Sequence, residues 1–475
     1  MGEFYAGASR IDITVTRDEQ ESKNERNYYS DTFPGGPVSP LYVRTLITIN
    51  NEDVMVIISL DLCATPKKLA DRIRKKVSEE LGVGVDCIAV CSTHTHSSPV
   101  MFPDDWSYTE RLVHKSAETA RKAYDSIKPA SIGAIKGYCN NISYNRCYPI
   151  TEVTPKEFYP NEKHLGGIMF ARDPFVGRCS GEPVDNEVGA ILLSDKEENP
   201  IAVVYNFSCH PATCIEGNYM HGDFPGFASK KIEEEIPCIT ALFLQGSAGS
   251  TNPVKFFGTW EDAKELGEKL ALEVLRIIPD ITLKKQVKTF KEYTSLPISL
   301  IEYDKDEIRR FLKDIEDYED TLHTNPEECW FGKAHTTVNL PPKFNLEQKL
   351  RYIKPMVDYC KNQLKDKINV KLKPLDHYVQ IFSWNDIALC MHSLELFCET
   401  GFEIKRLSPL RYTFPVSFAN GNLGYLPPKE KWKLGGYWRF TFPMFAGFNG
   451  MLDCSNISML TKKFLELTRS SLGNI

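Results

Sequence analysis

The chain has 475 residues, of which 42% are hydrophobic, and its formal net charge is −6. This length allows one large domain or two to three ordinary ones, each with a core. Nucleic-acid binders usually carry a basic stripe that neutralises phosphates, and the acidic balance argues against that class. The longest apolar runs, such as residues 54–60, are too short to cross a bilayer, so no transmembrane helix is predicted.

The N-terminal sequence and the cysteine pattern predict a reducing compartment. The N-terminal residues lack a basic segment followed by an apolar one, so the chain as given has no secretory signal. Its fourteen cysteines show no paired spacing, and Cys87, Cys209 and Cys390 lie within apolar runs. These features predict reduced core thiols and a cytoplasmic protein, or a secreted one if a signal has been removed.

The first regular elements form a β-α-β pattern. Residues 54–60 are a short, branched apolar run, residues 67–81 have helical charge spacing, and residues 87–92 are a second buried strand. This order predicts parallel strands joined by a helical crossover. An amphipathic helix at about 109–126 and a strand at 130–138 follow.

The same alternation continues along the chain. It predicts a strand at 202–210, a helix at 228–235, a strand at 238–245 and a helix at 260–277. Residues 281–298 resemble longer antiparallel strands, and 386–397 returns to buried-strand character. We expect an α/β fold with mixed, largely parallel β-sheets flanked by helices. The chain is interpreted as a single domain, residues 1–475, with an inserted helical hairpin or lid at about 303–375.

Polar residues follow several of the predicted apolar strands. Ligands of open α/β sheets bind beyond the carboxyl ends of the strands, so such residues are the best site candidates. They are Asp61, the pair His94 and His96, His210, the loop 246–253, and Glu395. A lone histidine at a strand end is usually a satisfied polar residue. Three histidines and a carboxylate at separate strand ends favour a metal site, and zinc is the first candidate for the metal.

The pair His94 and His96 is separated by one residue. In extended chain, side chains at positions i and i+2 point to the same side, so both imidazoles can face one ligand. If His94 binds the metal, His96 lies close enough to act beside it or to transfer protons.

Two further stretches are candidates for substrate binding. The loop GSAGSTNP, which contains Gly249, Ser250 and Asn252, could present backbone N–H groups to an anion or a carbonyl. A tight turn between strand and helix explains the same pattern equally well. Asp223 in HGDFPG is either a helix cap, which its spacing favours, or a site carboxylate.

Taken together, the motifs resemble the catalytic domain of the neutral, non-lysosomal ceramidase family. They occur in the order and spacing of that family and extend over most of the chain. The stretches are GASRIDIT at 7–14, STHTHSSP at 92–99, YNRCYP at 144–149, NFSCHPAT at 206–213, GDFPG at 222–226, FLQGSAGSTNP at 243–253, LELFCETGFEIKR at 394–406, and GNLGYLPP through GGY at 421–437.

The resemblance implies a zinc amidase that cleaves the N-acyl bond of ceramide. By motif position, it implies zinc ligands at His94, His210, Glu395 and Tyr425. Zinc in such a site lowers the pKa of bound water and polarises the scissile carbonyl.

The resemblance also implies the catalytic residues. His96 falls beside the substrate carbonyl, Arg146 falls on an arginine that lines the site, and Tyr437 falls on a tyrosine that helps to stabilise the oxyanion. The implied partner is a small-molecule or lipid-like substrate, and the implied process is lipid metabolism.

Two departures from the family pattern leave other functions open. Asn252 occupies the place of the family's serine, and an asparagine cannot be a nucleophile, although it can donate a hydrogen bond to an oxyanion. The sequence as given is also expected to end within the catalytic domain, before the immunoglobulin-like domain that ceramidases carry. The alternatives are a zinc hydrolase of a carbohydrate derivative or a lactone, and a small-ligand-binding protein without catalysis.

Overall fold

The structure is a computed structural model that describes most of the chain. The described residues are 3–25, 33–99, 104, 106–149, 168–170, 181–214, 219–256, 258–328, 330–331, 338–339, 345–365, 372–433, 438–439, 443 and 448–474.

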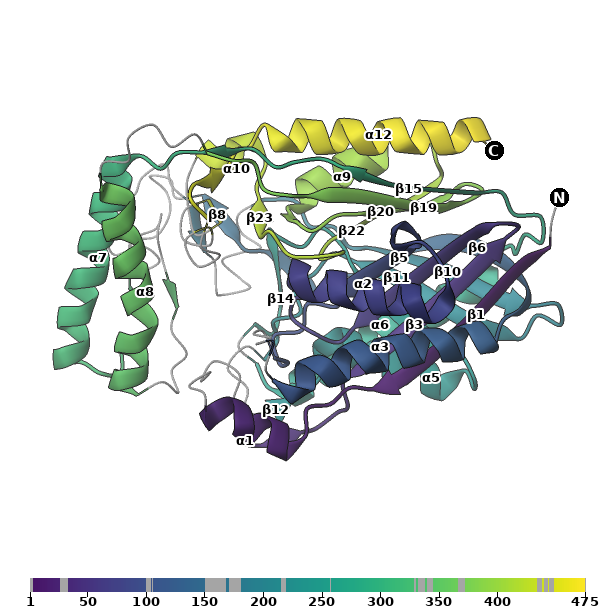
Figure 1. Ribbon diagram of the computed structural model, residues 1–475, viewed down its shortest axis with the longest axis horizontal. Coiled ribbons are helices and arrows are strands. Elements are labelled where there is room, and N and C mark those ends of the chain that lie inside the picture. Colours follow the sequence, from purple (N-terminus) through teal and green to yellow (C-terminus); the bar gives the residue numbers. More distant parts are fainter. Residues whose placement is uncertain are drawn as a thin grey trace.

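The largest element is an eight-stranded mixed sheet (Figure 1). Its strands, in spatial order, are β13 (Thr240–Gln245), β11 (Pro200–Phe207), β10 (Glu187–Asp195), β6 (Lys128–Tyr138), β1 (Phe4–Asp12), β3 (Tyr42–Asn50), β4 (Asp53–Leu60) and β5 (Ile88–Ser92). Strand β4 reads as a continuous apolar run because it is buried on both faces: Met55 and Ile57 face one core, and Val56 and Ile58 face another.

The α/β class and the mixed sheet are as expected, but the prediction of largely parallel pairing is wrong. Two of the seven neighbouring pairs are parallel, β4 with β5 and β11 with β13, and the other five are antiparallel. The parallel pairs are the two β-α-β units read from the sequence, and they lie at opposite ends of the sheet. Between them, strands such as β3 and β4 are joined by tight turns, which impose antiparallel pairing.

The eight-stranded sheet bends sharply at its centre. Strands β1 and β6 pair at only two positions, Tyr5 with Pro129 and Ala6 with Lys128. Beyond this bend β13 returns against β4, where the Ser59 hydroxyl donates to the Phe243 carbonyl at 2.7 Å. The bend therefore brings the two ends of the sheet, and the loops that follow β5, β11 and β13, toward each other.

A second sheet packs on the inner face of the first. It contains β15 (Thr289–Ser295), β19 (Tyr378–Trp384), β20 (Ile387–Met391) and β22 (Tyr412–Val416). Buried side chains of both sheets form one core, in which Leu46 and Ile57 join Phe382, Leu389 and Phe414.

Helices cover the two outer faces. Helices α2 (Lys67–Leu81) and α3 (Ser107–Asp125), with α5 (Asp223–Glu235) and α6 (Trp260–Ile277), cover the large sheet, and α9 (Cys398–Leu407) and α12 (Asn456–Asn474) cover the second sheet (Figure 1). The predicted core thiols Cys87, Cys209 and Cys390 are buried and free.

The region 303–375 contains two long helices, α7 (Lys305–Thr324) and α8 (Leu346–Leu364). They pack on each other beside the two-sheet body and share a small core with Tyr303 and Met451 (Figure 1). Among the described residues, the remaining α-helices are α1 (Arg17–Glu25) and α10 (Lys429–Lys433). Short strands in the same part of the chain pair as β2 (Gly36–Pro37) with β12 (Tyr219–Met220), β7 (Ser143–Asn145) with β14 (Thr251–Pro253), β8 (Cys147–Pro149) with β9 (Ile168–Phe170), β16 (Leu300–Ile301) with β24 (Met451–Leu452), β17 (Trp330–Phe331) with β18 (Val338–Asn339), and β21 (Glu395–Leu396) with β23 (Tyr425–Leu426).

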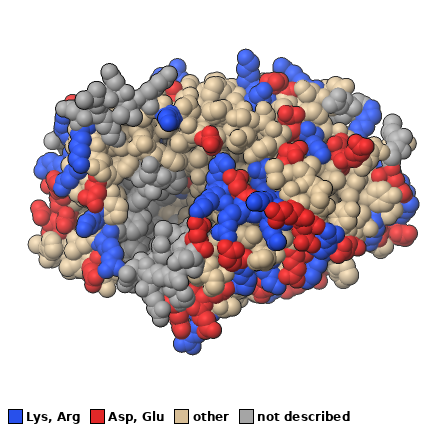
Figure 2. All heavy atoms as spheres, in the orientation of Figure 1, with Lys and Arg blue, Asp and Glu red and all other residues tan. Residues whose placement is uncertain are grey.

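The surface over α2 and α3 carries charges of both signs. Figure 2 shows acidic and basic side chains interspersed on this face, and pairs such as Lys67 with Asp71 and Arg121 with Glu80 account for the mixture. Among the helices that the structure describes, none has the length and apolar character that crossing a membrane requires.

Candidate metal centre

Three predicted site residues meet where separate strands end. His94 lies two residues beyond β5, His210 lies three residues beyond β11, and Glu395 opens the short strand β21. Strand β21 pairs with β23 so that Tyr425 lies directly opposite Glu395. The predicted strand 202–210 therefore ends earlier, at Phe207, and His210 lies in the loop that follows it.

The three histidines are in contact through their ring nitrogens. The Nε2 atom of His210 lies 2.9 Å from Nε2 of His94 and 2.9 Å from Nε2 of His96. Glu395 Oε2 lies 3.7 Å from His94 Nε2. One ligand atom from each of His94, His210 and Glu395 lies within 4.8 Å of the others, so these three residues can hold a metal ion.

The environment of His94 leaves one ring nitrogen available for a ligand. Its Nδ1 atom lies 2.6 Å from the Cys63 carbonyl oxygen. A carbonyl can only accept, so Nδ1 carries the proton, and the neutral ring presents the Nε2 lone pair to His210 and Glu395. Metal-binding histidines are commonly oriented in this way by a second acceptor.

The imidazoles are held neutral by their surroundings. Burial lowers the pKa of His94 and of His210 well below the usual range, with further opposition from the neighbouring histidines and the charge of Arg146. Burial also lowers the pKa of His96 to about 4, again helped by Arg146. At neutral pH all three rings therefore have a lone pair for a metal or a proton.

Glu395 is the group that most needs a cation. Burial raises its pKa to about 7, against the opposing effects of the Arg146 charge and the Tyr425 hydrogen bond. Its Oε2 atom is buried and has no hydrogen-bond partner. A buried carboxylate oxygen without a partner is costly, and a divalent cation shared with two imidazoles would remove that cost. The donor set therefore fits a metal ion.

Arg146 connects several of the predicted residues. Its Nε and Nη2 atoms donate to the Gly249 carbonyl at 3.1 and 2.8 Å, and Nη1 donates to Asn252 Oδ1 at 3.2 Å. Nη2 also donates to the Tyr425 hydroxyl oxygen at 3.1 Å, and Tyr425 in turn bonds to Glu395. This buried network fixes a permanent positive charge beside the candidate metal ligands.

The glycine-rich loop makes mainly structural contacts. The Gly249 N–H donates to the Leu396 carbonyl at 2.8 Å, and a Cβ at this position would lie 2.9 Å from the Glu395 carbonyl oxygen. The Ser250 hydroxyl accepts from the Cys398 N–H at 3.0 Å, at the start of α9. Both residues thus fasten β21 and α9, and the Gly249 N–H is already used by the protein and not presented to a substrate anion.

The buried carboxylates of Asp223 and Asp61 also interact with other groups of the protein. Asp223 lies in the first turn of α5, and its carboxylate accepts from the backbone N–H groups of Thr213 and Cys214, in the loop that carries His210. Asp61 forms an ion pair with Arg44 at 2.9 Å. Asp223 positions the histidine loop, and Asp61 belongs to a separate buried ion pair.

Two residues beside His94 had no signal in the sequence. Cys63 acts through its backbone carbonyl, which no side-chain pattern reveals, and Phe418 is an apolar residue at the end of an apolar run. The Phe418 ring stacks on the His94 ring, with centroids 3.8 Å apart and an interplanar angle of 19°. Cys63, His94 and His96 also form a group with metal-ligating atoms, but His94 Nδ1 already donates to the Cys63 carbonyl.

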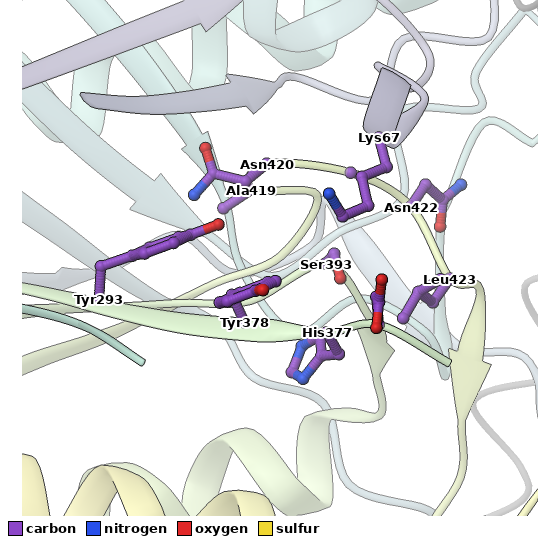
Figure 3. A pocket seen from close by; sticks show the side chains of 11 residues that line it. Lys67, Tyr293, His377, Tyr378, Ser393, Ala419, Asn420, Asn422 and Leu423 are labelled. Atoms are coloured by element: carbon purple, nitrogen blue, oxygen red, sulfur yellow. The ribbon is translucent and has the colours of Figure 1, made fainter. Parts of the chain in front are cut away.

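A pocket is lined in part by the residues that directly follow Phe418. Figure 3 shows it between Lys67 at the start of α2, Tyr378 on β19 and Asn420 in the loop after β22. None of the predicted site residues lines this pocket.

Tyr437, the remaining predicted catalytic residue, lies outside the described residues.

Comparison with known proteins identifies similar structures. No protein-family model and no curated protein sequence matches the chain. The crystal structure of neutral ceramidase from Pseudomonas aeruginosa superposes on 100% of this chain and 75% of its own, with a TM-score of 0.67 and 14% identity. A structure of a ceramidase complexed with C2 superposes on 98% of this chain and 75% of its own, with the same TM-score and identity.

Proposed function

We propose that this chain, which has a neutral ceramidase-like fold, is a zinc-dependent hydrolase of an amide (N-acyl) or related acyl bond. The observation that carries the proposal is the convergence of His94, His210 and the unpartnered carboxylate oxygen of Glu395. Because the similar structures are ceramidases, a lipid-like N-acyl compound is the first substrate to test.

The proposed zinc ligands are His94, His210, Glu395 and Tyr425. Two imidazoles with oxygen ligands suit zinc better than magnesium or calcium, which prefer oxygen alone. When bound, zinc would acidify a water molecule and polarise the scissile carbonyl.

His96 is the proposed proton carrier. It is less buried than His94, and its pKa of about 4 keeps it neutral at pH 7. In the hydrolysis, the oxygen of water adds to the acyl carbon and the C–N bond breaks. His96 accepts a proton from the water and delivers it to the leaving amine nitrogen.

Arg146 is the proposed source of fixed positive charge. Its hydrogen bonds to Gly249, Asn252 and Tyr425 hold the guanidinium in one place without any rearrangement during the reaction. A charge that is already in position stabilises the negative charge that develops on the carbonyl oxygen. Asn252 contributes by anchoring Arg146, and the family role of Tyr437 stays a prediction.

Zinc content and hydrolysis test the proposal together. Purified protein should contain about one zinc per chain, and it should release fatty acid from a fluorescent N-acyl sphingosine. N-acyl amino acids, acylated sugars and lactones assayed in parallel report the alternative bonds. Zinc without activity on any of them would favour a ligand-binding protein, and absence of zinc would contradict the proposal.

A His96→Gln variant tests the division of roles. We expect kcat to fall about 10²- to 10⁴-fold, the usual range for loss of a general base, while zinc affinity stays within a few-fold of wild type. A matched His377→Gln variant, in a buried histidine away from the site, should leave both quantities unchanged. A parallel loss of zinc in His96→Gln would make His96 a ligand instead.

A further inference from the structure

The ring of His94 is held on three sides by groups from different parts of the chain. Its Nδ1 atom bonds to the Cys63 carbonyl, its Nε2 atom faces His210 and Glu395, and one face of the ring lies on Phe418. The first two contacts fix the proton and the direction of the ring. The stacking contact fixes its plane.

Phe418 reaches His94 from the second sheet. It belongs to a segment, Ser417–Asn420, that leaves β22 and crosses to the large sheet. We call this segment the 417–420 clamp. Its backbone accepts from the Ser92 N–H through the Phe418 carbonyl at 3.2 Å, and the Asn420 N–H donates to the Val90 carbonyl at 2.7 Å.

Side-chain and further backbone bonds hold the clamp at both ends. Asn420 Oδ1 accepts from the Val90 N–H at 2.9 Å, and Asn420 Nδ2 donates to Gln380 Oε1 at 2.7 Å. At the other end the Ser417 N–H donates to the Gln245 carbonyl at 2.9 Å. The clamp therefore joins β5, β13 and β19 at the point where His94 leaves β5.

Both stacked residues have an unfavourable backbone conformation. His94 has φ = 70° and Phe418 has φ = 56°, in the left-handed region that residues other than glycine rarely adopt. Such strain persists where the surrounding bonds over-determine the conformation, and it concentrates at functional sites. Here the clamp and the end of β5 impose it on two residues whose rings must meet face to face.

From this geometry we infer that Phe418 is a positioning residue for His94, so that metal affinity depends on a second-sheet side chain that is itself no ligand. The inference rests on the proposed function, because it takes the group of His94, His210 and Glu395 as the metal site. Without the Phe418 ring, the plane of the His94 imidazole is no longer fixed about the Cβ–Cγ bond, so Nε2 is aimed less precisely at the other ligands even though the Cys63 bond remains. Groups that orient a metal ligand commonly change metal affinity 10- to 100-fold when they are removed.

The test compares Phe418→Leu with Phe414→Leu. Phe414 lies on β22, is equally buried, and packs on the Gly189 position of the large sheet, away from the histidines. Both changes remove a ring from the same layer. Leucine is not branched at Cβ, so at φ = 56° it should carry a backbone cost similar to that of phenylalanine.

Metal-stripped proteins would be titrated with zinc against a chromophoric chelator, and the absorption spectrum of the Co²⁺ form would report the coordination geometry. Phe418→Leu should bind zinc about tenfold or more weakly and alter the Co²⁺ spectrum. Phe414→Leu should lose similar thermal stability but bind zinc within about twofold of wild type. Phe418→Tyr, which keeps the ring, should restore most of the affinity.

The outcomes distinguish the positioning role of Phe418 from the proposed metal site. Wild-type zinc affinity in Phe418→Leu, or an equal loss in Phe414→Leu, would overturn the positioning role while leaving the metal site intact. Failure of the wild type itself to bind zinc would overturn the proposed function as well. If Phe418→Leu does not fold, Phe418→Met supplies the same comparison, because methionine adapts to irregular core space.

Discussion

The part of the chain that the structure describes contains two groups of buried histidines with similar burial but different partners. One is the cluster of His94, His96 and His210, and the other is His377, just before β19, with His392, just after β20. Burial lowers the pKa of His377 to about 4 and that of His392 to about 3, much as it lowers the pKa of His96. Burial and a low pKa therefore do not by themselves mark a metal site.

The two groups differ in convergence and in charge. In the cluster, ring nitrogens lie 2.9 Å apart and a carboxylate oxygen without a partner lies beside them. His377 donates to the Leu296 carbonyl, and His392 accepts from the Leu394 N–H, so each of these two rings is bonded to a backbone group and not to the other ring. Among the described residues, neither His377 nor His392 belongs to a group of three potential metal ligands.

The largest effect on zinc binding is expected from removing a proposed metal ligand of the cluster. His94→Ala and His210→Ala should each weaken zinc binding by more than about 100-fold, the upper end for changes beside a ligand, and should abolish hydrolysis. His377→Asn should leave zinc binding unchanged. Zinc analysis after dialysis, with competition titration, measures both. Full zinc occupancy in His94→Ala would contradict the ligand assignment, whatever the activity.

The sequence predicts which residues meet in the cluster, but the sheet geometry that brings them together differs from the predicted one. The strand-end pattern predicts that polar residues meet at one edge of a largely parallel sheet. The sheet is mostly antiparallel, and the loops after β5 and β11 meet because the sheet bends at Tyr5 and Ala6 and brings β13 back to β4. A bend that depends on two paired positions leaves no local pattern in the sequence.

The strand-end pattern is also less selective than it looks. His392 directly follows β20, as His94 follows β5, and the pattern alone would admit both. What separates them is the presence of Glu395 and Arg146 beside one histidine group, which is a matter of tertiary contact. Ser250, a substrate-binding candidate on loop composition, and Asp223, for which a helix cap is favoured over a site carboxylate, both bind backbone groups of the protein. Loop composition indicates where hydrogen bonds are available, but it does not indicate what they bind.

A smaller effect is expected from weakening the support of Arg146, whose fixed charge lies beside the cluster. Arg146 opposes protonation of all three cluster histidines, and Asn252 Oδ1 accepts from its Nη1 atom. Asn252→Ser shortens the side chain and removes this anchor. We expect kcat to fall roughly tenfold to a hundredfold, as for loss of one hydrogen bond to a charged group, with zinc content unchanged.

The same variant distinguishes two roles for the position. If a serine here were a catalytic group, Asn252→Ser would raise the hydrolysis rate. An Asn252→Asp variant is the matched control, because its carboxylate keeps an acceptor for Arg146 and should retain more activity than the serine variant.

The smallest expected effect concerns acid stability, where the two groups should respond differently to zinc. The pKa of His392 is about 3 in the folded protein, against 6.5 for an ordinary histidine. A depressed pKa means that the unfolded chain binds the proton more tightly. His392 therefore contributes stability that is fully present above about pH 6.5 and is lost as the pH falls toward 3.

His392→Gln should reduce proton uptake on unfolding by about one proton in this window, as measured from urea unfolding at several pH values. Zinc should steepen the acid dependence through the cluster, because its ligands must be neutral to bind, and it should leave the His392 contribution unchanged. An identical pH slope in wild type and His392→Gln would show that this histidine is not held neutral by burial, and the comparison between the two groups would then rest on the metal alone.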